Sequence, residues 1–134
     1  MIAVDTNIIC YYWLASPLSP QAEALQQREP IWITPPLWRS EFRNAVALSL
    51  RHRLLAMEDA IALVERAEDR LGRNEVVVSS RIVMELVAQS SCSAYDCEFV
   101  AIAQEHGLRL VTADRQVLRE FPQVAVSLAN FLAS

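Results

Sequence analysis

Lysine is absent from this chain of 134 residues, and glycine occurs only twice. Two glycines are too few for the Gly-rich loops, G-x-G-x-x-G or Walker A, that bind nucleotide phosphates. The three cysteines, Cys10, Cys92 and Cys97, form no C-x-x-C pair, so we expect reduced thiols and neither a disulfide framework nor a zinc site. The two histidines, His52 and His106, are not at the spacing of metal ligands.

Long hydrophobic runs are also missing. No stretch approaches the roughly 20 apolar residues that a membrane helix needs, and no basic segment followed by an apolar run marks an export signal. We therefore expect a cytoplasmic protein without membrane contact. With 53% hydrophobic residues the chain can build one real core, so a single domain over residues 1–134 is expected.

The formal net charge of −4 argues at first against a nucleic-acid partner. All twelve basic residues are arginine, however, and four of them gather within fifteen positions beside His52: Arg39, Arg43, Arg51 and Arg53. Composition alone favours a solvated helix face for this cluster over a binding surface. Net charge alone does not decide between the two.

Short apolar runs alternate with longer segments of helical period, which predicts an α/β fold with a parallel sheet covered by helices on both faces. The expected strands, four to five in the sheet, are Met1–Val4, Ile31–Thr34, Glu75–Ser79, Leu108–Thr112 and Val124–Val126. The expected helices are Thr6–Ala15, Pro20–Arg28, Pro36–Arg51, Met57–Leu71, Ser80–Gln89, Ala94–His106, Arg115–Glu120 and Leu128–Ala133.

Two acids stand where expected strands end. Asp5 ends the apolar run at the start of the chain, and LVTAD repeats that design at Asp114. In an open parallel sheet, ligands bind beyond the carboxyl ends of the strands. Taken alone, each acid is better explained as the N-cap of the following helix.

Glu41 is harder to explain by capping. Its carboxylate is expected on a largely apolar stripe, because its neighbours three, four and seven residues away on one helix face are Leu37, Asn44, Ala45 and Leu48. An unpaired buried charge is costly, so the side chain should be neutral or meet a cation. The alternative is an ordinary ion pair with a neighbour such as Arg43.

Asp96 lies one turn into an apolar helix, and its spacing from Ser93 is that of a capping box. Capping explains several of these acids singly but not their shared location: two at strand ends, and two in first turns of helices that start from the same edge. Carboxylates converging in one cleft repel one another unless a cation neutralises them. Oxygen ligands without histidine or thiolate favour Mg²⁺ or Mn²⁺.

Four stretches carry a resemblance to a known family: AVDTN, PPLWRSEFRN, SAYDCEFVAIA and LVTADR. In this order and at these intervals they resemble the PIN-domain nucleases, and in particular the free-standing VapC toxins of VapBC toxin–antitoxin pairs. The likeness covers essentially the whole chain. It implies a three-layer αβα sandwich, the PIN-like fold.

The resemblance also implies a site and a reaction. The residues that would hold one or two Mg²⁺ or Mn²⁺ ions are Asp5, Glu41, Asp96 and Asp114, with Thr6 and Thr112 as supporting hydroxyls. The implied activity is hydrolysis of RNA phosphodiester bonds by an in-line water, blocked by a small antitoxin. A homodimer is expected from the same likeness and from the apolar load of residues 57–71.

Arg39 and Arg43 lie within a turn of Glu41 and are candidates for phosphate contacts, although a structural or antitoxin-facing role explains them nearly as well. Two other functions compete with the nuclease. A receiver-like signalling domain is disfavoured because the chain has no lysine to place beside a phosphorylated aspartate. A catalytically silent module that uses the same fold to bind RNA or protein is the alternative.

Overall fold

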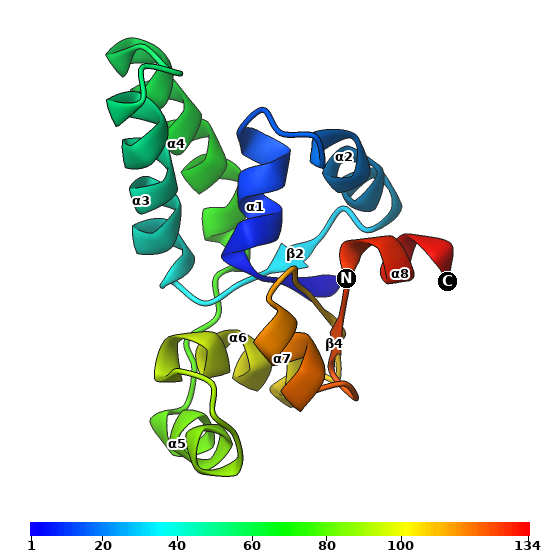
Figure 1. Ribbon diagram of the computed structural model, residues 1–134. Coiled ribbons are helices and arrows are strands. Elements are labelled where there is room, and N and C mark those ends of the chain that lie inside the picture. Colours follow the sequence, from blue (N-terminus) through cyan, green and yellow to red (C-terminus); the bar gives the residue numbers. More distant parts are fainter.

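The computed structural model describes residues 1–134 and contains one parallel sheet of four strands in the order β2-β1-β3-β4 (Figure 1). The strands are short: β1 (Ile2–Val4), β2 (Trp32–Ile33), β3 (Leu110–Val111) and β4 (Ala125–Val126). All three pairings are parallel, with Ala3 of β1 opposite Ile33 on one side and Leu110 on the other. The first strand of the chain is therefore central.

Eight α-helices surround the sheet. They are α1 (Thr6–Trp13), α2 (Ser19–Arg28), α3 (Trp38–Arg51), α4 (Met57–Leu71), α5 (Ser80–Gln89), α6 (Ala94–Glu105), α7 (Arg115–Glu120) and α8 (Leu128–Ala133). Figure 1 shows α1, α3 and α4 on one side of the sheet and α5, α6 and α7 on the other. The predicted three-layer α/β fold is confirmed.

The core forms where the apolar strands meet α6, the helix that buries the most side chains. Ala3, Val4, Leu110 and Val111 are fully buried in the sheet, as expected of parallel strands covered on both faces. Helix α6 packs against β1 and β3 and buries every side chain but one from Cys97 to Ala103. This packing fixes α6 against β1 and β3.

One predicted strand is wrong. Residues 75–79 carry three consecutive valines, which favour a strand, but only a single bridge joins Thr34 to Glu75. A 3₁₀ turn, Gly72–Asn74, precedes this segment, and Val77 is 82% exposed. The segment instead links α4 to α5, and its pairing with the sheet is limited to this bridge at Thr34, the residue after β2.

The other predicted elements are present. Four helices have the predicted bounds, namely Met57–Leu71, Ser80–Gln89, Arg115–Glu120 and Leu128–Ala133, and the other four differ by one or two residues at one end. The three cysteines are free thiols. None of the helices combines the length and apolarity needed to span a bilayer.

Candidate metal centre

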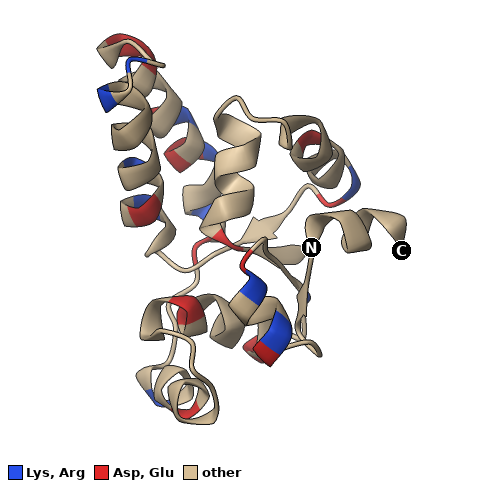
Figure 2. Cartoon of the chain, in the orientation of Figure 1, with Lys and Arg blue, Asp and Glu red and all other residues tan.

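Two of the predicted site residues lie at the carboxyl ends of neighbouring strands. Asp5 follows β1 and caps α1, and Asp114 follows β3 after a short link and caps α7. Because β1 and β3 pair in parallel, with Val4 opposite Val111, both acids emerge at one edge of the sheet. Figure 2 shows acidic residues gathered where α1, α3, α6 and α7 begin.

Asp5 is the most buried of the four acids, with 7% of its surface exposed. Its Oδ1 accepts a hydrogen bond from Thr6 N at 2.8 Å, and its Oδ2 accepts one from Thr112 Oγ1 at 2.7 Å. Burial raises the pKa of Asp5 to about 6, against the lowering effect of these two hydrogen bonds. The charges of Glu41 and Asp96 raise it further, which places both carboxylates near Asp5.

Glu41 lies in the first turn of α3 and accepts a hydrogen bond from Thr6 Oγ1 at 2.7 Å. It has no ion-pair partner, so the alternative of a pair with Arg43 is not what the structure contains. Partial burial raises the pKa of Glu41, the bond from Thr6 lowers it and the charge of Asp96 raises it. Thr6 thus links Asp5, through its backbone N–H, with Glu41, through its hydroxyl.

The apolar stripe expected around Glu41 is not the buried face of α3. The side chains that α3 buries are Trp38, Phe42 and Val46, whereas Leu48 is 49% exposed. The two stripes are adjacent on the helix, so the spacing alone did not separate them. Glu41 lies at the margin of the core, half-buried, rather than within it.

Asp96 lies in the first turn of α6, whose N-cap is Ser93. The backbone N–H of Asp96 donates to Ser93 Oγ at 3.1 Å, which is one half of the expected capping box. Burial raises the pKa of Asp96 and the charge of Asp114 raises it further, against hydrogen bonds with Ser93. Asp96 therefore lies near both Asp114 and Glu41.

Asp114 is a working N-cap: its Oδ1 accepts from Gln116 N at 2.9 Å and from Val117 N at 3.1 Å. Its own N–H donates to Thr112 Oγ1 at 3.0 Å, and the same hydroxyl donates to Asp5. One threonine thus connects the two strand-end acids. The capping interpretation and the shared location hold together, since a cap uses only part of a carboxylate's acceptor capacity.

None of the four acids forms a salt bridge. The nearby arginines are engaged elsewhere: Arg39 pairs with Glu68 at 3.0 Å and with Glu75, and Arg43 pairs with Glu68 at 3.4 Å. Trp38 Nε1 also donates to Glu75, at 2.8 Å. Arg39 therefore ties the start of α3 to the end of α4, which is a structural role; phosphate contact by Arg39 or Arg43 stays a prediction.

Two polar residues near the site were not singled out from the sequence. Burial and the charge of Glu41 raise the pKa of Glu98, so this α6 carboxylate lies close to the α3 acid. Asn7 contacts both Asp5 and the segment before Asp114. Both stand inside the stretches AVDTN and SAYDCEFVAIA, and that position was the only signal the sequence offered for them.

The donor set fits a hard divalent ion. Its carboxylate oxygens come from four different elements, and no arginine neutralises them. The charges of neighbouring carboxylates raise the pKa of Asp5, Glu41 and Asp96. As the side chains stand, no three His, Cys, Asp or Glu residues are gathered closely enough to hold a metal. An ion would have to draw the carboxylates together.

Comparisons with known proteins identify structures of the same fold and the family. In fold the chain is similar to FitAcB from Neisseria gonorrhoeae (TM-score 0.75, 19% identity, 96% of this chain and 99% of that one). It is also similar to PAE2754 from Pyrobaculum aerophilum (0.70, 19%, 98% and 93%) and to a toxin–antitoxin complex from Klebsiella pneumoniae (0.70, 16%, 96% and 98%). No curated protein matches the sequence.

These structural relatives establish the fold alone, because their sequence identities are low. The family assignment comes from the sequence itself, where the family model of the PIN domain matches residues 2–125 and so spans all four acids and the whole sheet up to β4. The chain belongs to the PIN-domain family.

Proposed function

We propose that the protein is a metal-dependent ribonuclease, the toxin of a toxin–antitoxin pair. The observation that carries this proposal is the set of four carboxylates, Asp5, Glu41, Asp96 and Asp114, brought to one edge of the sheet without a single arginine partner. Uncompensated acids that raise one another's pKa destabilise a fold. Bound Mg²⁺ or Mn²⁺ would neutralise these carboxylates, which explains why they lie together.

Each residue has a proposed role. Asp5, with Asp96 or Asp114, ligates a first ion, and Glu41 ligates through water or assists proton removal. Thr112 and Thr6 hold Asp5 and Glu41 in place through their hydroxyls. A divalent ion in such a site supplies an activated water, an oriented phosphate and neutralisation of charge on the attacking and leaving oxygens.

The proposed partners are RNA, as substrate, and a small antitoxin. The antitoxin is supported by the structural similarity to a complex described as toxin and antitoxin from Klebsiella pneumoniae. A homodimer is supported by apolar side chains left exposed around the distal end of the α3–α4 pair. These are Leu48, Leu54, Met57 and Ile61, which are 49%, 75%, 58% and 39% exposed.

A catalytically silent module that binds RNA or protein is the second candidate. One observation favours it: the acids do not enclose a metal site as they stand. Three of them also have a structural use at helix starts, since Asp5 and Asp114 cap helices and Asp96 completes part of a capping box.

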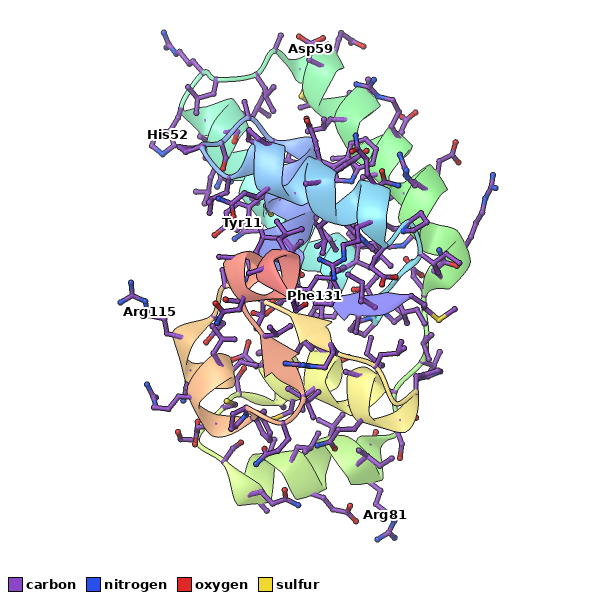
Figure 3. The ribbon with its side chains drawn as sticks, turned by 90° about the vertical axis from the view of Figure 1, so that its right-hand side faces the viewer. Tyr11, His52, Asp59, Arg81, Arg115 and Phe131 are labelled. Atoms are coloured by element: carbon purple, nitrogen blue, oxygen red, sulfur yellow. The ribbon has the colours of Figure 1, made fainter.

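The decisive experiment is cleavage of a mixed RNA substrate during titration with Mn²⁺ and Mg²⁺. We expect cleavage that requires the metal, stops on chelation and is lost in Asp5→Asn and Asp96→Asn. Asp59→Asn is the matched control, because Asp59 is an exposed acid in the first turn of α4, far from the site (Figure 3). Cleavage that persists in both site variants would refute the nuclease, and binding without cleavage would favour the silent module.

A further inference from the structure

Asn7 joins two segments that both carry site acids. It lies in the first turn of α1, two residues after Asp5. Its Oδ1 accepts a hydrogen bond from the backbone N–H of Ala113, at 3.1 Å, in the link between β3 and Asp114. Its Nδ2 lies 3.4 Å from Asp5 Oδ2 and 3.4 Å from Thr112 Oγ1. One amide thus spans the space between the two strand-end acids.

The direction of each hydrogen bond in this network is fixed. A backbone N–H can only donate, so the oxygen of Asn7 must face Ala113 and its NH₂ group must face Asp5 and Thr112. Thr112 Oγ1 accepts from the N–H of Asp114 and therefore turns its hydrogen toward Asp5. All donors near Asp5 Oδ2 point at the carboxylate, which suits its ionised form.

We propose that Asn7 is a positioning residue, which holds the Asp114 segment against Asp5 and so sets the spacing of the two carboxylates before an ion arrives. This inference rests on the proposed metal site. Asn7 does not need to touch ion or substrate to act. Groups that orient metal ligands typically change metal affinity by 10–100-fold when they are removed.

The test is the affinity for Mn²⁺ alone, measured by isothermal titration calorimetry on the full chain, with thermal unfolding recorded in parallel. We expect Asn7→Ala to bind Mn²⁺ about 10-fold more weakly or worse, while the protein remains folded. RNA cleavage by this variant should recover as Mn²⁺ is raised, because the ligands themselves are intact. Asn130→Ala is the control, since Asn130 lies exposed in α8 and its side chain makes no hydrogen bond.

Asn7→Ser provides a second variant in case the alanine variant unfolds. Serine is too short to span from Asp5 to Ala113, so the same weakening is expected. Unchanged Mn²⁺ affinity in a folded Asn7 variant would overturn the positioning role, as would a loss of cleavage that excess Mn²⁺ does not restore. If the wild-type protein binds no Mn²⁺, or Asp5→Asn binds it equally well, the proposed metal site itself fails, which is a distinguishable result.

Discussion

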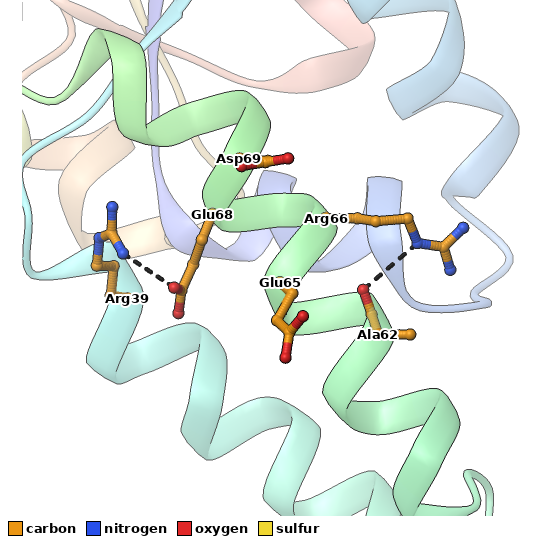
Figure 4. A pocket seen from close by; sticks show the side chains of 6 residues that line it. All are labelled: Arg39, Ala62, Glu65, Arg66, Glu68 and Asp69. Atoms are coloured by element: carbon orange, nitrogen blue, oxygen red, sulfur yellow. Dashed lines mark hydrogen bonds and ion pairs between the residues drawn. The ribbon is translucent and has the colours of Figure 1, made fainter.

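Two acidic regions of this molecule differ in how their charge is balanced. Between α3 and α4 lies an open hollow of about 540 Å³, whose charged lining is Arg39, Glu65, Arg66, Glu68 and Asp69 (Figure 4). There Arg39 pairs with Glu68 at 3.0 Å. At the carboxyl edge of the sheet, four acids meet without any arginine partner. The hollow is therefore the compensated region: its acid Glu68 has two arginine partners, Arg39 and Arg43, whereas no acid of the candidate site has one.

This difference in arginine partners distinguishes a candidate metal site from an ordinary charged surface hollow. Surface acids on helices readily find arginines one turn away or on the next helix, and such pairs need no further explanation. The four site acids lie at strand ends and helix starts, where the polypeptide brings hydroxyls, backbone N–H groups and the Asn7 amide to them, and no arginine. The arginine partners of Glu68, and the lack of any for the four site acids, separate the hollow from the candidate metal site.

The largest expected effect comes from removing a site carboxylate. Asp5→Asn should lower metal-dependent RNA cleavage by more than about 100-fold, because loss of a proposed ligand should exceed the 10–100-fold cost of losing a group that only orients one. Asp69→Asn, in the compensated hollow, should leave the rate within about 2-fold of wild type. The rates are compared under single-turnover conditions. Equal losses of cleavage rate in Asp5→Asn and Asp69→Asn would show that the two regions do not differ in function.

The second expected effect is a pH dependence of the stability of the metal-free protein. The folded-state pKa of Asp5 is raised from 3.8 to about 6, so the folded protein keeps this proton longer than the unfolded chain. Its contribution therefore makes the metal-free protein less stable as pH rises from about 4 to above 6, by about 3 kcal/mol in total. Urea unfolding across this pH range should show the decline in wild type and a weaker one in Asp5→Asn.

Added Mg²⁺ or Mn²⁺ should oppose that decline, because these ions bind deprotonated carboxylates. The burial that raises the pKa of Glu41 and Asp96 acts in the same direction as for Asp5. A metal-free protein whose stability increases over this pH range would show that these carboxylates are compensated after all.

A smaller effect is expected in the compensated region. Arg39→Ala leaves Glu75 and Glu68 without their half-buried partner and frees the start of α3, so unfolding should become easier by about 1–3 kcal/mol. Arg43→Ala removes only a longer pair from an exposed side chain and should change stability by less than about 0.5 kcal/mol. Chemical denaturation measures both. Equal changes in the free energy of unfolding for the two variants would show that Arg39 does not join the start of α3 to the end of α4.

Local sequence patterns predicted most of the fold. Apolar runs, caps and helical periods locate the strands and helices to within two residues at most ends, and they place Asp5 and Asp114 at strand ends. The failure at residues 75–79 has a physical reason: strand propensity does not supply a neighbouring strand, and only Thr34, the residue after β2, pairs with this segment. Whether a β-ladder forms depends on tertiary contacts rather than on the segment's own sequence.

The contacts that shape the site were less visible in the sequence. The sequence leaves open whether Arg39 contacts phosphate or has a structural role, and it does not reveal the pair with Glu75, whose own segment it predicts as a strand. Asn7 meets Ala113 across 106 positions of the chain. Such partners depend on how helices are placed over the sheet, which periodicity within one helix does not encode.

The most direct test of the account is a crystal structure grown with Mn²⁺ and phased on its anomalous signal. The account predicts an ion at the carboxyl edge of the sheet, with oxygens of Asp5 and of Asp96 or Asp114 within about 2.0–2.3 Å, a range set by the ligand distances of comparable hard divalent ions. An edge without an ion, while Mn²⁺ occupies the α3–α4 hollow beside Glu65 and Asp69, would contradict it.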